Sequence, residues 1–417
     1  MGLLVQKFGG TSVEGPERLK SVARRLVTAR DAGNDVVGVL SAMGGATDDL
    51  VDLAHQISPA PHPRELDMLL SVGERISCAL AAMAIHDLGH TAISLTGSQA
   101  GVVTDTDHTR AKVLEIRPQR IHDALAQGAI VLVAGFQGVS TAHEVTTLGR
   151  GGSDTTAVAL AAALRADTCE IYTDVEGVFT ADPRLVPQAR KLDAVSYEEM
   201  LELAASGAKV LMLRAVEFAR NHGVRIHVRS SLSANEGTWV VSQEELMEQP
   251  IISGIAHDTS EAEVTILGVP DRPGIAARVF RTLADVGVNV DMIVQNVSAE
   301  GHTDISFTLP KSQMRRAEEV LEPLAAEIGA SGVAHDPEIA KISLVGAGMR
   351  THPGVAADMF DALAEAGINI GIISTSAVRI SCVVPARQIE RAVQAVHDRF
   401  KLHEPVVTAD ASAPVSG

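Results

Sequence analysis

The sequence of 417 residues is poor in cysteine and in aromatic residues. Its three cysteines, Cys78, Cys169 and Cys382, are far apart and form no C-x-x-C pair. This spacing argues against a disulfide framework or a structural zinc site, and it favours a reduced, intracellular protein. Aromatic residues make up only 3% of the chain, so the core must consist mainly of alanine, valine, leucine and isoleucine.

Long apolar runs are also missing. The longest, residues 157–164, is far shorter than the roughly 20 residues of a membrane span, and Met1 leads directly into a strand-like segment without a signal-peptide pattern. The formal charge of −17 argues against a nucleic-acid-binding surface, because phosphate backbones repel such a field. We therefore expect a cytoplasmic protein that binds neither a membrane nor nucleic acid. The charge does not exclude a small anionic substrate, which needs only a local cluster of donors.

Short apolar runs alternate with helical patterns over residues 1–235. The runs are almost continuously apolar, as strands buried on both faces of a sheet are. Strands separated by helices predict an α/β fold with a mainly parallel sheet sandwiched by helices. The predicted strands are residues 3–8, 36–40, 92–95, 130–134, 169–172 and 225–228, and the predicted helices are residues 16–32, 65–88, 117–127, 154–164 and 197–205.

The character of the sequence changes near residues 230–252, where turn-forming and polar residues gather, so we place a linker and the entry to a second part at residues 236–262. A repeat follows. R-P-G-I-A-A-R-V-F at residues 272–280 returns as H-P-G-V-A-A-D-M-F at residues 352–360, 80 residues later. This duplication predicts two modules, residues 263–338 and 339–417, each with a strand, a Pro-Gly turn, a helix and another strand.

The first segment that suggests chemistry is K-F-G-G-T-S at residues 7–12, which is predicted to close the first strand and open the first helix. Its glycines let the backbone approach an anion, a helix N-terminus supplies free N–H groups, and Lys7 can lie along phosphate oxygens. It is not a Walker A sequence. Taken alone, it is equally compatible with a plain glycine turn beside a lysine.

The second segment is G-R-G-G-S-D at residues 149–154. Arg150 offers a planar fork that can grip a carboxylate in two places. Ser153 or Asp154 is an N-cap candidate for the helix that follows. Three glycines around an arginine are more than a helix cap needs, and a flexible glycine loop is the alternative interpretation.

The third segment is Y-T-D-V-E-G-V-F-T-A-D-P-R at residues 172–184, directly after another predicted strand. Loops at the carboxyl edge of a parallel sheet are where ligands bind in such folds. Taken alone, its acidic residues are also compatible with an ordinary solvated turn.

In this order, the three segments resemble those of the amino acid kinase family and, within it, those of aspartate kinases. S-A-M-G-G-A-T-D at residues 41–48 and G-E-R-I-S at residues 73–77 add to the match. The repeats resemble ACT domains, so the resemblance implies the amino acid kinase fold followed by two ferredoxin-like βαβ-type modules. It covers nearly the whole chain. The chain departs from the family pattern at Phe179, where many relatives have tyrosine. The phenylalanine lacks the hydroxyl that could contact the nucleotide.

The resemblance also implies roles for individual residues. The ATP-binding set is Lys7, Phe8, Gly9, Gly10, Thr173, Asp174, Phe179, Asp182, Arg184 and Lys209. The aspartate-binding set is Thr47, Glu74, Arg150 and Ser153, with Glu74 taking the ammonium and Arg150 the α-carboxylate. Lys7 and Asp154 would be catalytic, with Asp154 organising Mg-ATP, and no residue is assigned as a direct metal ligand. Lys209 by itself is equally compatible with an ordinary lysine at a helix end.

The implied reaction is direct phosphoryl transfer from ATP to the side-chain carboxylate of L-aspartate. The product would be 4-phospho-L-aspartate, at the first step of lysine, threonine and methionine synthesis. The acceptor is already ionised near neutral pH, so no general base is needed. Lys7, backbone N–H groups and Mg²⁺ would offset the repulsion between the two anions.

The ACT resemblance implies feedback by lysine, threonine or both. Asp271, Asn289, Gln295 and Asn296 are the candidate effector contacts, since N–H groups at the Pro-Gly turns suit a carboxylate and Asp271 an ammonium. Modules that serve only dimerisation are the alternative. We further expect a homo-oligomer, or assembly with a shorter regulatory chain made from an internal start near Met247.

Other functions remain open at this point. Glutamate 5-kinase, N-acetylglutamate kinase and uridylate kinase share the expected fold, and the paired repeats, Thr47 and Glu74 favour aspartate over them. A non-catalytic amino-acid sensor is a different class of answer, against which Lys7 and residues 149–154 argue. A metal site at His86 and His90 lacks a third ligand.

Overall fold

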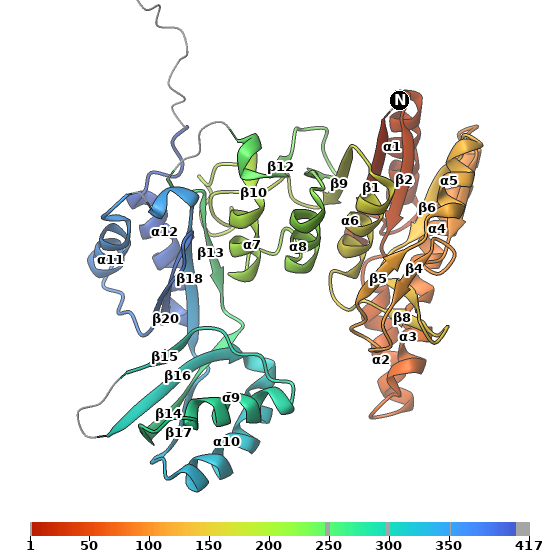
Figure 1. Cartoon of the computed structure of the whole chain (residues 1–417). Coiled ribbons are helices and arrows are strands. Elements are labelled where there is room, and N and C mark those ends of the chain that lie inside the picture. The colour runs from red at the N-terminus through yellow and green to blue at the C-terminus, as the bar shows by residue number, and fades with distance from the viewer. Residues whose placement is uncertain (1, 247–250, 297–300, 351, 406–417) are drawn as a thin grey trace, which may run out of the picture. The chain divides into compact units, whose positions relative to one another are not determined.

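The computed structural model describes residues 2–246, 251–296, 301–350 and 352–405, and it divides into two compact units. The first unit comprises Met1–Val178, Lys191–Ala204 and Lys209–Met247. The second comprises Phe179–Arg190, Ala205–Ala208 and Glu248–Gly417 (Figure 1). Two short segments from the first half of the chain therefore belong to the C-terminal unit.

The first unit is built on an eight-stranded sheet. Its strands are β1 (Leu3–Phe8), β2 (Asp35–Leu40), β3 (Ala92–Leu95), β6 (Ile130–Ala134), β9 (Thr168–Thr173), β10 (Ala194–Ser196), β11 (Ile226–Ser230) and β12 (Thr238–Val241). They follow the order β10-β12-β11-β9-β1-β2-β6-β3, and all neighbours are parallel except β11 and β12. The mainly parallel sheet and its six predicted strands are confirmed. The short strands β10 and β12 were not predicted.

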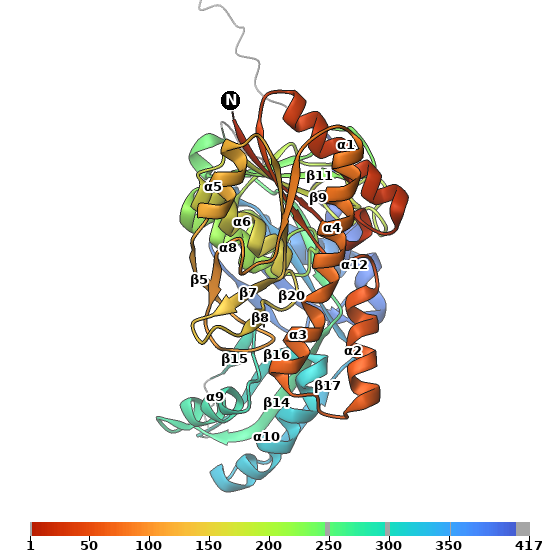
Figure 2. The ribbon, with the colours of Figure 1, turned by 90° about the vertical axis from the view of Figure 1, so that its right-hand side faces the viewer.

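The first unit also contains α-helices. They are α1 (Pro16–Asp31), α2 (Ala46–Ile57), α3 (Pro63–Leu70), α4 (Val72–Asp87), α5 (Gln119–Ala126), α6 (Gly152–Leu164), α7 (Tyr197–Ala205) and α8 (Leu213–His222). Helices α1 and α4 pack together over β2 and β6, whereas α6 packs with α8 and lies over β1 and β9 (Figure 2). Alternate residues of β6, Ile130, Leu132 and Ala134, enter the buried cluster beneath α1 and α4, as the two-residue period of a strand requires.

The predicted helix over residues 65–88 is two helices, α3 and α4, joined at Ser71. The Ser71 hydroxyl donates to the Met68 carbonyl, and the Ser71 carbonyl accepts from the side chain of Gln137. A side chain that bonds to the local backbone competes with the helical ladder, which explains the break. Pro63–Asp87 is the one stretch among the described residues with the length and composition of a membrane span, and half of its most apolar part is buried within the structure.

A second, smaller sheet lies beside these two helices. It contains β4 (Val102–Thr104), β5 (Val113–Ile116), β7 (Gln137–Ser140) and β8 (Val145–Thr147) in the order β5-β4-β7-β8. Strand β8 packs on α3 and ends directly before the glycine-rich segment 149–154. This sheet was not predicted, and its strands have only three or four residues.

The second unit contains the two predicted modules. The first consists of β14 (Glu261–Pro270), α9 (Ile275–Asp285), β15 (Ile293–Gln295), β16 (His302–Pro310), α10 (Met314–Ile328) and β17 (Gly332–Asp336). Its antiparallel sheet has the order β15-β16-β14-β17. The second consists of β18 (Ile339–Val345), α11 (Val355–Glu365), β19 (Ile373–Thr375), β20 (Arg379–Pro385) and α12 (Ile389–Arg399). The helices α9 and α11 begin 80 residues apart, as the repeat predicts.

The second module borrows its fourth strand from the segment before the first module. Its sheet has the order β13-β18-β20-β19, and β13 (Gly254–Asp258) pairs antiparallel with β18. Strand β13 occupies the place that β17 has in the first module. The region predicted as a linker, residues 236–262, therefore holds two sheet strands, β12 in the first unit and β13 in the second.

Candidate functional site

A cavity of about 600 Å³ lies in the first unit, at the carboxyl ends of β1 and β2. Seven of the residues singled out from the sequence line it together: Lys7, Gly10, Thr47, Glu74, Arg150, Ser153 and Asp154. Lys7 and Arg150, from segments far apart in the sequence, therefore share one cavity. Ligands bind at this edge of the sheet in open parallel α/β folds.

Lys7 and Asp154 form an ion pair at the cavity. The Lys7 ammonium lies 2.6 Å from Asp154 Oδ1, and both side chains are about nine-tenths buried. Lys7 comes from β1 and Asp154 from the first turn of α6. The pair therefore holds the ammonium group at the cavity wall, where it can meet an anion.

Two helix N-termini open on the same cavity. Gly45 precedes α2 with φ of 79°, and Gly151 precedes α6 with φ of 70°, a left-handed conformation that glycine adopts without strain. At Gly151 a Cβ atom would lie 1.9 Å from the Met212 side chain, so glycine is also required sterically. The free N–H groups and positive dipole ends of both helices favour bound anions.

Two predictions about these helix starts are wrong. Helix α6 begins at Gly152 with Gly151 as its N-cap, so neither Ser153 nor Asp154 caps it. The segment 7–12 does not open α1 either, because a short 3₁₀ turn (Gly10–Ser12) intervenes and α1 begins at Pro16. The positive helix ends at the cavity are those of α2 and α6, and the sequence analysis did not predict α2.

Glu74 is the acidic group of the cavity with an open hydrogen-bonding position. It is 3% exposed, and its Oε1 accepts from the Ala42 N–H at 3.1 Å. Its Oε2 is buried and has no hydrogen-bond partner among the described residues. Burial raises the pKa of Glu74 to about 7, and the Ala42 N–H opposes this shift only in part. This oxygen is therefore open to a hydrogen-bond donor from a ligand.

The remaining predicted nucleotide residues of the first unit lie outside the cavity lining. Phe8 is fully buried and stacks on Tyr172 at 4.7 Å, so its side chain is unavailable to a nucleotide and only its backbone could bind one. Thr173 ends β9 and donates to the Asp174 carboxylate at 3.0 Å. Lys209 is exposed after α7. Gly9 lies close to the Lys7 ammonium: a Cβ atom on residue 9 would be 3.3 Å from Lys7 Nζ.

Phe179, Asp182 and Arg184 belong to the second unit. Asp182 accepts a bidentate interaction from Arg184, with an ion-pair distance of 2.7 Å, and this hydrogen bonding lowers the pKa of Asp182. Phe179 is half-buried. Their assignment to the nucleotide site stays a prediction.

Several cavity residues escaped the sequence analysis. Thr109 lies in an irregular loop between β4 and β5, and nothing in its local sequence marks it. Thr147 ends β8 two residues before Gly149, which is a weak signal because it joins a strand end to the glycine-rich segment. Phe136 and Met212 also line the cavity, and both lie outside the recognised motifs.

A smaller cavity of about 300 Å³ lies in the first module, beside the N-terminus of α9. Asp271 and Gln295 line it, whereas Asn289 and Asn296 do not. The Asn289 N–H instead donates to the Gln313 side chain at 2.9 Å, and the Asn296 carbonyl accepts from the Thr303 hydroxyl. Two of the four candidate effector residues thus share a cavity. Met247, the candidate internal start, lies outside the described residues.

Comparison with known proteins agrees with this division. Residues 2–230 match the amino acid kinase family, and residues 264–323 and 342–400 match the ACT domain. The chain is 60% identical to the aspartokinase of Mycolicibacterium smegmatis and 54% identical to that of Corynebacterium glutamicum, each over 407 residues. Each alignment covers 96% of this chain and 97% of the relative.

Solved structures give the same answer. Escherichia coli aspartokinase III in complex with aspartate and ADP is similar with a TM-score of 0.80 at 27% identity, over 95% of this chain and 99% of that one. The same enzyme in complex with lysine and aspartate gives a TM-score of 0.74 at 26% identity, with the same coverage. By sequence over nearly its full length and by structure, this chain belongs to the amino acid kinase family and, within it, to the aspartokinases.

Proposed function

We propose that this aspartate kinase transfers the γ-phosphoryl group of ATP directly to the side-chain carboxylate of L-aspartate in the first-unit cavity, giving 4-phospho-L-aspartate. The observation that carries the proposal is the meeting of Lys7, Glu74 and Arg150 in one cavity between two helix N-termini. The complex of the E. coli relative with aspartate and ADP supports the choice of substrates.

Each group of the cavity takes a part that its chemistry suits. Glu74 accepts the substrate ammonium, Arg150 grips the α-carboxylate, and Thr47 and Ser153 bind the remaining oxygens. Lys7 lies between donor and acceptor and stabilises the charge that spreads over the transferring phosphoryl group. Because the acceptor carboxylate is already ionised, the mechanism needs no general base.

The nucleotide would be held by Gly9, Gly10 and Lys7 at its phosphates. The other proposed contacts in the first unit are the Phe8 backbone, Thr173, Asp174 and Lys209, whereas the roles of Phe179, Asp182 and Arg184 stay predictions from the sequence. Mg²⁺ is commonly held by one or two carboxylates together with substrate phosphates, and the Asp154 carboxylate at the cavity fits that pattern. When bound, Mg²⁺ would neutralise part of the phosphate charge. Asp154 would hold the ion and keep the Lys7 ammonium in place.

Steady-state kinetics on two variants tests this assignment. Lys7→Ala should lower kcat by on the order of 10²-fold or more, because it removes charge stabilisation in the transition state. Arg150→Gln should raise KM for aspartate and change KM for ATP little. Lys20→Ala, an exposed lysine of α1 paired with Glu17, is the matched control. Near-normal turnover of folded Lys7→Ala protein would refute the role of Lys7.

We further propose that lysine, threonine or both inhibit the enzyme through the ACT domains. Support comes from the cavity at α9 with Asp271 and Gln295, and from the lysine complex of the E. coli relative. Activity should fall when one or both amino acids are added, and Asp271→Asn should weaken the response. Asp285→Asn, at the other end of α9, is the control. Unchanged kinetics with lysine, threonine and their mixture would reject this regulation.

The wider setting of the enzyme is also a proposal. The reaction would begin lysine, threonine and methionine synthesis in the cytoplasm, which the three free, buried cysteines suit. A homo-oligomer is supported by exposed apolar residues at four-residue spacing on α4, namely Val72, Ile76 and Leu80. Native mass spectrometry would detect this oligomer, or instead an assembly with a chain that starts near Met247.

A further inference from the structure

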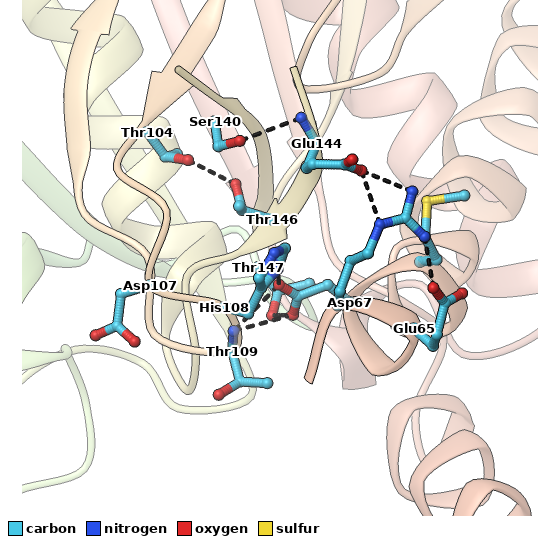
Figure 3. Close-up of polar contacts among 12 residues, drawn as sticks. Glu65, Asp67, Thr104, Asp107, His108, Thr109, Ser140, Glu144, Thr146 and Thr147 are labelled. Atoms are coloured by element: carbon cyan, nitrogen blue, oxygen red, sulfur yellow. Dashed lines mark hydrogen bonds and ion pairs between the residues drawn. The ribbon is translucent and has the colours of Figure 1, made fainter. Parts of the chain in front are cut away.

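Asp67 on α3 is a fully buried carboxylate that contacts Thr109 and Thr147, two residues of the cavity lining (Figure 3). It accepts from the Thr147 hydroxyl at 2.5 Å, from the Thr109 N–H at 3.1 Å and from His108 Nδ1 at 2.7 Å. Among the described residues, His108 is the only group within ion-pair distance that can carry a positive charge. A buried carboxylate persists only when such donors satisfy it, so this cluster is a fixed arrangement.

Thr109 shows that the arrangement holds a strained backbone. Its φ is 68°, the left-handed region that a β-branched residue rarely adopts. Such conformations persist where the surroundings impose them, and they gather at functional sites. Here the Thr109 N–H donates to both oxygens of Asp67, so the carboxylate fixes the strained residue. Thr109 itself lines the cavity.

The same carboxylate fixes the strand that leads to Arg150. Thr147 ends β8, and its carbonyl accepts from the Ala111 N–H at 3.0 Å, which ties β8 to the Thr109 loop. A Cβ atom on residue 149 would lie 3.1 Å from the Thr109 carbonyl oxygen. The glycine-rich segment 149–154 therefore packs directly on the loop that contains Thr109. Asp67 therefore holds both neighbours of the segment that carries Arg150.

A second contact ties α3 to the small sheet farther from the cavity. Arg64 Nε donates to Glu144 at 2.9 Å, and the ion pair closes at 2.7 Å (Figure 3). Both side chains are 39% exposed, and neither residue lines the cavity. Exposed pairs of this kind contribute little, so Arg64 serves as a comparison for the buried contact on the same helix.

We propose that Asp67 is a positioning residue for the amino-acid substrate: through Thr147 and Thr109 it holds the Arg150 segment in the conformation that binds the substrate carboxylate. It acts through other residues, since it does not line the cavity. The inference rests on the proposed role of Arg150. It predicts a selective effect, because the Lys7 side of the cavity is held separately by Asp154.

Steady-state kinetics with aspartate and ATP varied in turn tests the proposal. Asp67→Ala removes the acceptor of all three donors and should raise KM for aspartate on the order of 10- to 100-fold, since small misplacements of binding groups have effects of that size. KM for ATP should stay within about twofold. Asp67→Asn, which keeps one acceptor oxygen, should recover most of the loss. Equal changes in both KM values, or none, would overturn the proposal.

Thr147 gives a second route if Asp67→Ala fails to fold. Thr147→Val keeps the shape and removes the donor, so it should raise KM for aspartate, whereas Thr147→Ser keeps the hydroxyl and should not. In an Asp67→Ala background that folds, Thr147→Val should add less than it does alone, because Asp67→Ala has already removed the acceptor of the Thr147 hydroxyl. Full additivity would contradict a shared mechanism.

Two controls separate this proposal from the assignment of Arg150. Asp107→Asn removes a charge from the same loop, and its side chain points away from Asp67, so both KM values should stay unchanged (Figure 3). Arg150→Gln should raise KM for aspartate in the same assay. If it does while Asp67→Ala and Thr147→Val do not, positioning by Asp67 is refuted and the role of Arg150 stands. If Arg150→Gln has no effect, both are refuted.

Discussion

Glu74 should make the empty enzyme less stable above neutral pH. Burial raises its pKa from 4.5 to about 7 in the folded protein. The folded state therefore holds the proton to a higher pH than the unfolded state does, and ionised Glu74 costs roughly 3 kcal/mol of folding free energy above pH 7. The cost shrinks as pH falls from 7 toward 4.5, where the residue is protonated in both states.

The variant Glu74→Gln removes this titration and nearly preserves the shape. The free energy of unfolding of the variant minus that of the parent should be larger at pH 8 than at pH 5, by about 2 kcal/mol. Any fixed effect of the amide appears equally at both pH values and cancels from this comparison. Glu65→Gln, on the exposed surface of α3, controls for the loss of one negative charge.

Urea unfolding at pH 5, 6, 7 and 8 measures the effect. Trp239 is the single tryptophan of the chain and lies on β12 of the first unit, so its fluorescence reports on the unit that holds Glu74. A stability difference between parent and Glu74→Gln that is the same at all four pH values would refute the argument. Such a result would mean that burial does not raise the pKa of Glu74 in the folded protein.

Two further predictions concern other buried groups. His227 stacks on Trp239 with 4.0 Å between the ring centroids. Burial and, to a smaller extent, the charge of Arg229 lower the pKa of His227 to about 4. Trp239 fluorescence should therefore stay constant from pH 8 to 5 and change only near pH 4, and a transition near pH 6.5 would contradict this. Lys341 is 1% exposed and forms ion pairs with Glu261 at 2.5 Å and Asp291 at 2.6 Å. Lys341→Met should leave these two carboxylates without their cation. The free energy of unfolding of the second unit, measured by thermal unfolding, should fall by about 3–5 kcal/mol. A loss under about 1 kcal/mol would show that the cluster is hydrated.

The fold was largely predictable because its main elements carry strong local signals. The central strands β2 and β6 are buried on both faces and read as continuous apolar runs. The duplicated Pro-Gly turn located both modules. Strand β10 was missed because its three residues carry no usable period, and β12 was missed because it lies in the turn-rich region that was interpreted as a linker. Strand β13 was missed for another reason, since its partner β18 lies more than 80 residues away and only the tertiary fold pairs them.

The site was predictable where chemistry is concentrated in one short segment. Lys7, Arg150 and Asp154 stand beside glycines that no ordinary turn requires in that number. Thr109 and Thr147 carry no such mark, because their importance comes from a carboxylate on α3 far from either in sequence. Local patterns report what a segment can do by itself, and they cannot report which distant side chain holds it in place.

Binding and stability should respond to pH with opposite signs at Glu74. Ionised Glu74 is what a substrate ammonium needs, and the same ionised group is what the empty fold tolerates poorly. Aspartate affinity should therefore fall about tenfold for each pH unit below 7 while the empty protein gains stability. In the proposed complex, the substrate ammonium would donate the hydrogen bond that Oε2 lacks in the empty protein. Titration calorimetry at pH 6 and 8 would detect the proton released when aspartate binds at the lower pH, and identical proton counts at both would exclude Glu74 as the ammonium ligand.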